Sequence, residues 1–451
     1  MFKVKELASY FPNGRGATQD SIIIREVMTD TRVQKKQSLF VPLVGENHDA
    51  HRFLMEAIKM GAVAALWQED HELPKEIPTE FPVFFVEDTL RALQETSSFY
   101  LRKVNPVVIG ITGSNGKTTT KDLTASVLQV KYRTHKTAGN FNNHVGMPLT
   151  ILSMPLDTEV AVLEMGMSQA GEISLLSKLA QPRHVMITNI GESHIEYLGS
   201  REGIAKAKLE ILDGWKQGSF IYDGDEKLLG EYHQTPHAFA CGFHSSSDVV
   251  IRDITLEENR SLFTIGKDQY ELSMSGKHNV KNAAYVVTLA KEMGLTVKEI
   301  QTGLKHLQMS GMRFEKHTGL NGALIINDAY NASPTSMKAT IEIILELNSK
   351  SKKILILGDM FELGAHADQL HKEVATAITK EITAVYTIGE HAAQIIEGLN
   401  ERNLDIETKH FKDKDSLSHH VQKQLNSDTV VLLKASRGMK LEVMLNDLLV
   451  E

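Results

Sequence analysis

The stretch GITGSNGKTTT, residues 110–120, has the composition of a loop that binds phosphate. It follows the apolar run NPVVI, which indicates a buried strand. Small residues let backbone N–H groups approach a phosphate, and the N-terminus of a following helix adds partial positive charge. Lys117 can reach the β- and γ-phosphates, and the Thr118 hydroxyl can bind Mg²⁺. The candidate nucleotide-binding residues of this loop are Gly113, Ser114, Asn115, Gly116, Lys117, Thr118 and Thr119.

The spacing of the glycines differs from the widespread pattern G-x-x-x-x-G-K-[ST], which requires glycine at position 111. This chain has Ile111 there, and its glycines occupy positions 110, 113 and 116. After the loop, Leu123, Val127 and Val130 predict the apolar stripe of a helix. A turn that merely connects strand and helix is the alternative, and the coincidence of strand, loop, Lys-Thr pair and helix disfavours it.

Two further polar residues stand at the ends of apolar runs. Glu164 lies in EVAVLEMG (159–166), and His194 follows HVMITNIG (184–191). A carboxylate suits Mg²⁺, whereas the ion does not favour nitrogen ligands. From spacing alone, a solvated glutamate and a hydrogen-bonded loop histidine remain alternatives to metal ligands.

Lys208 lies in the apolar stripe of a predicted helix, SREGIAKAKLEILDGW, whose N-cap is Ser200. It is four residues after Ile204 and three before Ile211, so it points inward, whereas Lys206 points elsewhere. An inward lysine must find an anion or lose its charge. The alternative is a lysine whose stem reaches solvent.

The elements that must position these residues form three α/β segments. Residues 1–105 predict a small α/β unit, 106–312 a central domain with a mostly parallel sheet, and 313–451 a Rossmann-like domain without G-x-G-x-x-G. Pro106 disfavours a helix that continues across the first junction. In such sheets ligands bind at the carboxyl ends of the strands, where the loop, Glu164 and residues 189–194 all fall.

Length and composition exclude several classes of protein. A chain of 451 residues is too long for one core, and 57 acidic against 49 basic residues give a net charge of -8. We find no basic stripe, so we expect no nucleic-acid partner. Cys241 is the single cysteine, and no signal peptide or membrane span is expected, so we predict a cytoplasmic protein.

The chain resembles the Mur ligase family of ATP-dependent enzymes that form amide bonds. The shared motifs are TGSNGKTTT, LEMGMS, TNIGESHIEYLGS, AKAKLEI, GKHNVKNAAYV (276–286), MRFE and INDAYNASPTSM. The glycine spacing 110, 113, 116 is the pattern of this family. The resemblance runs from about residue 25 to 445, with Thr31 in TDTR and Ala435 in KASRG as small departures.

The resemblance implies ATP, two Mg²⁺ ions and a role for each metal-site residue. Lys117 would hold the β- and γ-phosphates, Thr118 and Glu164 would bind one Mg²⁺, and His194 the other. Lys208 matches a lysine that is carbamylated by CO₂ in many relatives, and its carbamate would be a further Mg²⁺ ligand.

It also implies residues for the nucleotide and the substrates. Asn279 and Asn282 would lie by the adenine, Asp328 by the ribose, with Asn331 nearby, and Arg313 would reach the γ-phosphate. The implied substrate-binding residues are Asp30, Thr31 and Arg32 for uridine diphosphate, Asn140, Asn142 and Asn143 for the muramoyl-peptide, and Ser436 and Arg437 for an incoming dipeptide.

Four stretches favour the family member whose substrates are UDP-muramoyl-tripeptide and D-alanyl-D-alanine. They are TDTR with SLFVPLVGENHDAHRF, KTAGNFNNHVGMPLTIL, DAYNASPTSM and LGDMFELG. We expect a monomer whose third domain swings onto the second when ATP binds. The sequence leaves open whether the third residue of the tripeptide is lysine or diaminopimelate.

Several rival interpretations are disfavoured. The ligase that adds the third residue typically has a Tyr-x-His arrangement where this chain has DAYNASP, and a folylpolyglutamate synthase would lack the uridine-diphosphate domain. A GTP-dependent switch should carry N-K-x-D, which is absent. A non-catalytic scaffold would not need the loop lysine, the strand-end carboxylate and the third-domain arginine together.

Overall fold

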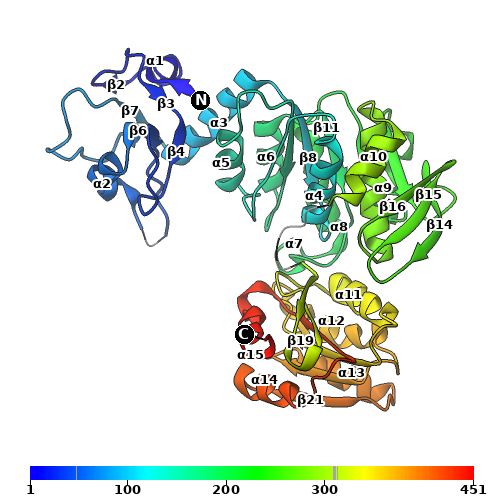
Figure 1. Cartoon of the computed structure of the whole chain (residues 1–451). Coiled ribbons are helices and arrows are strands. Elements are labelled where there is room, and N and C mark those ends of the chain that lie inside the picture. Colours follow the sequence, from blue (N-terminus) through cyan, green and yellow to red (C-terminus); the bar gives the residue numbers. More distant parts are fainter. Residues whose placement is uncertain (47, 308–310, 312, 451) are drawn as a thin grey trace.

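The computed structural model describes residues 1–46, 48–307, 311 and 313–450, and its sheets follow one another along the chain (Figure 1). The N-terminal unit has a five-stranded sheet in the order β2-β7-β6-β5-β4, and β1 pairs with β3. Its elements are β1 (Phe2–Lys3), α1 (Val4–Leu7), β2 (Gly14–Arg15), β3 (Ile23–Ile24), β4 (Glu26–Met28), β5 (Ser38–Phe40), α2 (Leu54–Lys59), β6 (Ala62–Gln68), β7 (Val83–Val86) and α3 (Thr89–Val104).

Helix α3 joins the N-terminal unit to the central domain. Asp88 caps its first turn, and Asn105 ends it in the left-handed conformation directly before Pro106. The helix packs on α5 (Gly146–Leu152) and α6 (Glu172–Ala180), and the Tyr100 hydroxyl donates to the Met154 carbonyl at 2.6 Å. The hydrophobic core is therefore continuous across the predicted junction at 105/106.

The central domain is built on a nine-stranded sheet in the order β16-β15-β14-β13-β12-β11-β8-β10-β9. Its strands are parallel from β9 to β14, and β15 and β16 add an antiparallel edge, so the expected mostly parallel sheet is confirmed. The strands are β8 (Val107–Thr112), β9 (Thr134–Lys136), β10 (Val160–Glu164), β11 (His184–Ile187), β12 (Phe220–Asp223), β13 (Ala238–Gly242), β14 (Val249–Leu256), β15 (Ser261–Ile265) and β16 (Asp268–Leu272). The remaining helices are α4 (Lys117–Leu128), α7 (Ile195–Leu198), α8 (Arg201–Leu209), α9 (Lys277–Glu292) and α10 (Val297–Lys305).

The register of three central strands determines where the site forms. β8 lies between β10 and β11, with Glu164 opposite Ile111 and Ile187 opposite Thr112. All three strands are parallel, so the phosphate loop, Glu164 and the segment after Ile187 meet at one edge of the sheet, as the sequence predicts.

The helix after the phosphate loop is shorter than its apolar stripe predicts. Leu123 and Val127 are buried in the core between the sheet and α9. Val130 is 40% exposed, because α4 ends at Leu128 and the chain turns before the stripe can continue. The inclusion of Val130 in the stripe was therefore wrong.

The C-terminal domain has a six-stranded sheet in the order β17-β18-β22-β19-β20-β21, with only β17 antiparallel. Helices cover both faces of the sheet, which bury two hydrophobic clusters (Figure 1). The elements are β17 (Glu315–Thr318), β18 (Leu324–Asn327), α11 (Pro334–Glu346), β19 (Lys352–Gly358), α12 (Ala367–Val374), β20 (Ala384–Ile388), α13 (Ala393–Glu401), β21 (Glu407–Phe411), α14 (Lys414–Gln422), β22 (Thr429–Lys434) and α15 (Leu445–Leu448). Residue 312, the predicted end of the central domain, lies outside the described residues, so this boundary remains a prediction.

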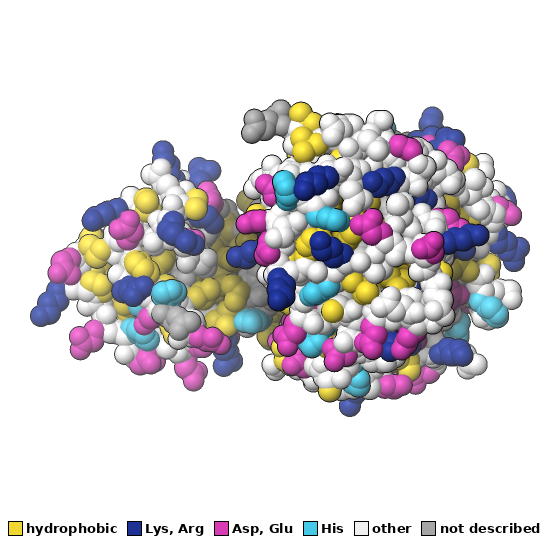
Figure 2. Space-filling model, turned by 90° about the horizontal axis from the view of Figure 1, so that it is seen from below, with side chains coloured by type: hydrophobic (Ala, Val, Ile, Leu, Met, Phe, Trp, Pro, Cys, Tyr) yellow, Lys and Arg dark blue, Asp and Glu magenta, His cyan; other side chains and the backbone are white. Residues whose placement is uncertain are grey.

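The face of the molecule seen from below carries charges of both signs. Lys and Arg side chains alternate with Asp and Glu over the C-terminal domain, without a basic stripe (Figure 2). Among the described residues, no helix is both long and apolar enough to span a membrane.

Candidate active site between the central and C-terminal domains

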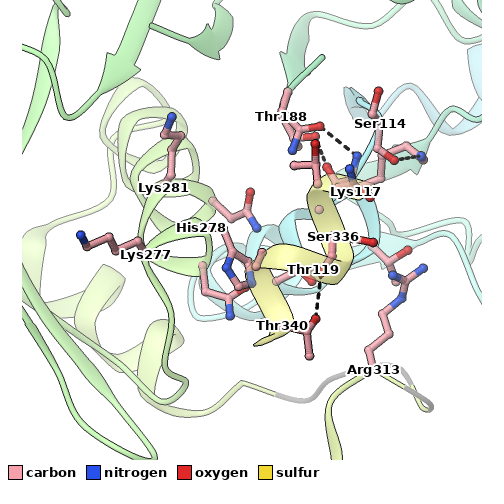
Figure 3. Close-up of a pocket in the computed structure, with 18 of the residues that line it drawn as sticks. Ser114, Lys117, Thr119, Thr188, Lys277, His278, Lys281, Arg313, Ser336 and Thr340 are labelled. Atoms are coloured by element: carbon pink, nitrogen blue, oxygen red, sulfur yellow. Dashed lines mark hydrogen bonds between the residues drawn. The ribbon is translucent and has the colours of Figure 1, made fainter. Parts of the chain in front are cut away.

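A cavity of about 500 Å³ lies between the central and C-terminal domains. The phosphate loop and the start of α9 line one side, and α11 with the chain around Arg313 lines the other (Figure 3). Of the residues predicted to bind nucleotide, those that line the cavity are Ser114, Asn115, Gly116, Lys117, Thr118, Thr119, Asn279, Asn282, Arg313, Asp328 and Asn331. The fold thus brings together residues more than 200 positions apart in the sequence.

The backbone of the phosphate loop needs glycine at two positions. Gly113 has φ 150° and Gly116 has φ 79°. A Cβ on Gly113 would lie 1.9 Å from the Thr188 hydroxyl, and one on Gly116 would lie 2.9 Å from the Asn282 side chain. In this chain, the close approaches of Thr188 and Asn282 therefore favour glycine at positions 113 and 116.

The segment after β11 holds the loop from behind. The Asn115 N–H donates to Asn189 Oδ1 at 2.9 Å, and the Ser114 N–H donates to the Asn189 carbonyl at 3.1 Å. The Thr188 hydroxyl donates to the Asn115 carbonyl. These bonds preorganise the loop. Sequence analysis placed Asn189 at the end of a strand but assigned it no binding role.

Lys117 folds back over the loop, and its Nζ donates to the Gly113 carbonyl at 2.8 Å. Burial lowers the pKa of Lys117, nearby Glu164 opposes this effect, and Arg313 adds to it. Two cations thus approach one another across the cavity, and a phosphate chain between them would relieve their repulsion.

Glu164 is buried at the end of β10, next to the first turn of α4. Its Oε2 accepts from the Thr118 hydroxyl at 3.0 Å, and its Oε1 accepts from Asn142 Nδ2 at 2.9 Å. A carboxylate and a hydroxyl oxygen suit Mg²⁺. The donor set therefore fits the metal site that the family resemblance implies.

Lys208 is 1% exposed, and Lys206 on the same helix is exposed, as the helical stripe predicts. The Ser200 side chain caps this helix by accepting from the Gly203 N–H. Burial first, and then the charge of Lys117, lowers the pKa of Lys208 well below its usual range. The Lys208 ammonium group has no partner among the described residues. As expected from the sequence, this lysine must therefore find an anion or lose its charge.

His194 precedes α7 and points toward the C-terminal domain. Its Nδ1 lies 2.5 Å from Glu362 Oε2. This contact lowers the pKa of Glu362. Neither His194 nor Glu164 is among the described residues that line the cavity, although Glu164 contacts the lining residue Thr118.

Residues of the C-terminal domain that are predicted to bind nucleotide have close local partners. Asp328 accepts from Lys434 Nζ at 2.5 Å and from the Thr340 hydroxyl at 2.8 Å. The Arg313 guanidinium lies 4.4 Å from the centre of the Tyr330 ring. Sequence reasoning missed Tyr330 and Lys434, although both belong to motifs it quoted, DAYNASP and KASRG.

Three residues missed by sequence reasoning form a polar cluster, and two of them, Asp223 and Lys281, line the cavity. Lys281 Nζ lies 2.7 Å from both Asp223 and Asp225. Burial lowers the pKa of Lys281, but the two carboxylates outweigh it and raise the pKa overall. The signal available was the family motif GKHNVKNAAYV, in which Lys281 is the second lysine.

None of the predicted substrate residues lines this cavity in the part of the chain that the structure describes. Arg32 pairs with Asp30 at 2.6 Å, next to Thr31 in the N-terminal unit. Asn142 contacts Glu164, and Asn143 Oδ1 accepts the N–H of Gly146 at the start of α5, whereas Asn140 is exposed. Ser436 donor and acceptor groups bind the chain around Asp359 and Phe361, and Arg437 contacts Glu442.

Comparisons with known proteins agree with this arrangement. Residues 111–290 match the Mur ligase middle domain, and residues 312–437 match the Mur ligase glutamate ligase domain. The chain is 45% identical over 435 residues to the UDP-N-acetylmuramoyl-tripeptide–D-alanyl-D-alanine ligase of Bacillus subtilis. The aligned region covers 95% of this chain and 94% of that protein.

Solved structures of similar proteins match nearly the whole chain. MurF from Acinetobacter baumannii superposes with a TM-score of 0.87 at 27% identity, over 99% of this chain and 98% of that one. The MurF ligase from Thermotoga maritima in complex with ADP superposes with a TM-score of 0.81 at 27% identity, over 95% and 98%.

Proposed function

The chain belongs to the Mur ligase family, and we propose that it joins D-alanyl-D-alanine to the terminal carboxylate of UDP-N-acetylmuramoyl-tripeptide with hydrolysis of ATP. The product is the UDP-muramoyl-pentapeptide used in peptidoglycan synthesis. The observation that carries this proposal is the shared cavity, in which the phosphate loop of one domain faces Arg313 and Asp328 of another. Similarity over 95% of the chain to a ligase of this name supports the choice of substrates.

The reaction needs activation, because a carboxylate oxygen is a poor leaving group. Transfer of the γ-phosphoryl group of ATP to the tripeptide carboxylate gives an acyl phosphate and ADP. The free amine of D-alanyl-D-alanine attacks the acyl carbon, and the tetrahedral intermediate collapses to an amide and inorganic phosphate. The amine loses one proton to solvent or to a neighbouring base as the amide forms.

Charge neutralisation is the main demand on the protein, because ATP and the accepting carboxylate are both anionic. Lys117 and Arg313 are cations on opposite walls of the cavity and would bind the phosphates. Thr118, Glu164 and His194 would hold Mg²⁺, which when bound neutralises phosphate charge. Asn279, Asn282, Asp328 and Asn331 would bind the nucleoside.

We further propose that Lys208 reacts with CO₂ to give a carbamate that serves as a metal ligand. Carbamylation requires a neutral amine, and Lys208, which is buried and has no ammonium partner among the described residues, has a pKa lowered in the required direction. Protein incubated with ¹³C-bicarbonate should give a carbamate NMR signal that is absent from Lys208→Ala and present in Lys206→Ala. Short carboxylates should restore part of the activity lost in Lys208→Ala, and full activity without them would refute the proposal.

The remaining assignments concern the substrates. Asp30, Thr31 and Arg32 would bind uridine diphosphate, Asn140, Asn142 and Asn143 the muramoyl-peptide, and Ser436 and Arg437 the dipeptide. We also propose a cytoplasmic monomer, because Cys241 is buried and unpaired and one chain supplies both walls of the cavity. Light scattering after gel filtration tests the oligomeric state.

One experiment tests the function as a whole. The protein is incubated with Mg-ATP and UDP-muramoyl-tripeptide containing either lysine or diaminopimelate, with a panel of amino acids and dipeptides. Phosphate release and the mass of the nucleotide product are measured. We expect a product only with D-alanyl-D-alanine, and a preference between the two tripeptides identifies the third residue. Amide formation with a single amino acid instead would assign a different ligation step to this chain.

A further inference from the structure

Glu362 is the residue of the C-terminal domain that contacts the predicted metal ligand His194. It lies in LGDMFELG, a stretch that suggested the family but had no role assigned to any of its residues. Its Oε2 lies 2.5 Å from His194 Nδ1, and the two side chains are 39% and 20% exposed. The contact crosses from one domain to the other.

The backbone around Glu362 fixes this contact on both sides. The Glu362 carbonyl accepts from the Glu196 N–H at 3.2 Å, and the Ile195 side chain packs against the hydrophobic core of the C-terminal domain. His194 and Glu362 both have left-handed backbone conformations, with φ 65° and 63°. Two strained residues in contact indicate that the surrounding structure holds this geometry.

The two ring nitrogens of His194 differ in their surroundings. Nδ1 lies 2.5 Å from Glu362 Oε2, although the two groups are not aligned as a hydrogen bond, whereas Nε2 has no hydrogen bond or ion pair with any residue that the structure describes. A carboxylate at one ring nitrogen fixes the proton there, orients the ring and leaves the lone pair of the other nitrogen for a metal. The 2.5 Å separation is that of a carboxylate–histidine pair, in which Nε2 could bind a metal.

We propose that Glu362 is a positioning residue for His194 and makes the metal site complete only when the C-terminal domain is docked. This inference rests on the proposed function, because it takes His194 as a ligand of the ATP-bound metal. It gives domain docking a chemical consequence: movement of the C-terminal domain removes the partner of Nδ1, and the imidazole loses its fixed tautomer and orientation.

The opposite interpretation is that the Glu362 carboxylate competes with the metal for His194. It predicts that removal of the carboxylate strengthens metal binding, whereas a positioning residue predicts that removal weakens it. The direction of the change in metal affinity therefore decides between the two.

The test uses the full chain and Mn²⁺ as the probe, with free Mn²⁺ measured by electron paramagnetic resonance. Glu362→Ala should raise the Mn²⁺ dissociation constant about tenfold or more. Glu362→Gln, which keeps an acceptor oxygen, should recover most of this loss. Unchanged or tighter Mn²⁺ binding by Glu362→Ala would overturn the proposal.

A second measurement reports on the ring itself without metal or turnover. In protein with ¹⁵N-labelled histidine, the His194 signals, assigned by their loss in His194→Gln, should show Nδ1 protonated and Nε2 unprotonated. Glu362→Ala should give a mixture of tautomers. The same tautomer in Glu362→Ala and the unchanged protein would contradict a positioning role.

A matched control exists within the same domain. Asp368 contacts His391 Nδ1 at 2.7 Å in another carboxylate–imidazole pair, both members of which belong to the C-terminal domain. Asp368→Ala should leave Mn²⁺ affinity and the His194 tautomer unchanged. Failure of the unchanged protein to form any amide would refute the proposed function, whereas amide formation with full Mn²⁺ affinity in Glu362→Ala would refute only this inference.

Discussion

At the scale of single residues, the environment of Lys117 favours a negatively charged ligand in the cavity. Its ammonium group now uses a loop carbonyl as acceptor, and burial lowers its pKa. The carboxylate that opposes this effect, Glu164, is the predicted metal ligand. An anionic ligand in the cavity would supply the charge that Lys117 lacks and would favour its protonated form.

Replacement of Lys117 should therefore remove catalysis while the fold survives. We expect Lys117→Ala to lower the rate of dipeptide-dependent phosphate release about 100- to 1000-fold, as for other lost stabilising charges. Circular dichroism and the thermal transition should stay close to those of the unchanged protein. Lys206→Ala, on an exposed helix position, should retain full activity, and turnover by Lys117→Ala near the normal rate would refute the role of the loop.

At the scale of elements, the phosphate loop is shaped by its neighbours as much as by its own sequence. Gly113→Ala would place a methyl group against Thr188 and impose a side chain on a φ of 150°. Such strain costs about 1–3 kcal/mol, which corresponds to about 5- to 150-fold in nucleotide affinity if the loop must distort to relieve it.

Calorimetric titration with ADP measures this effect. The matched control is Gly171→Ala, because Gly171 also has a positive φ, 88°, but an added Cβ there meets no atom within 4 Å. Strain alone should affect stability in both variants, whereas ADP affinity should fall only in Gly113→Ala. Equal ADP affinities in the two variants would show that the contact with Thr188 does not shape the loop.

A second element-scale feature is the side-chain network between β6 and the turn before α2. Ligand atoms of Asp49, His51 and His71 lie within 4.8 Å of one another, which is compatible in distance with a metal site. However, His51 Nε2 accepts from the Gln68 N–H at 3.3 Å while its Nδ1 faces Asp49. A metal at Nδ1 would require loss of both ring protons, so we interpret the group as a hydrogen-bond network.

This network predicts a pH dependence of stability. Burial raises the pKa of Asp49, but donors from His51 and His71 outweigh it and lower the pKa to about 2. A folded-state pKa below the unfolded value of about 3.9 stabilises the fold above that pH, and the contribution disappears as pH falls toward 2. Because Asp49 is 43% exposed, we expect it to contribute only about 1 kcal/mol.

Urea unfolding of the N-terminal unit, followed by Trp67 fluorescence in a Trp215→Phe background, can measure this contribution. Asp49→Asn should be less stable than its parent at pH 6, and the difference should shrink at pH 3. Asp70→Asn, which alters a more exposed partner of His71, should give a smaller difference at pH 6. If Asp49→Asn lowered the free energy of unfolding equally at pH 6 and pH 3, the attribution of this pH dependence to the Asp49 carboxylate would be wrong.

At the scale of the whole molecule, the features that could be predicted from the sequence are those that depend on local spacing or on a sequence motif. The alternation of strands and helices predicted three α/β segments. Helical spacing correctly predicted that Lys208 is buried and that Lys206 is exposed. The stripe failed at Val130 because the end of a helix depends on the tertiary turn that follows it. The contacts of Glu362 with His194 and of Lys434 with Asp328 join residues far apart in the sequence, and no local periodicity could reveal them.

Several polar contacts between described residues join the C-terminal domain to the central domain, among them those of Ser333 and Thr335. Ser333 donates to Asn115 at 3.0 Å, and Thr335 donates to Glu192 at 2.7 Å. Lys117 and Arg313 line the same cavity from opposite domains, so ATP would contact both when they are docked and only one when they are apart. A ligand with such unequal affinity for two states shifts the population toward the docked state.

Energy transfer between dyes on Lys298→Cys and Lys412→Cys, both exposed positions, can follow this shift in single molecules. Native Cys241 should not react with the dyes, because it is buried and its pKa is raised to about 12. A non-hydrolysable ATP analogue with Mg²⁺ should increase the docked population, and Lys117→Ala should reduce this response. If the distribution of energy-transfer efficiencies showed only the docked state and did not change on addition of the analogue, the two domains would already be fixed in the docked arrangement. ATP would then bind to a preformed site, and its binding would not cause domain closure.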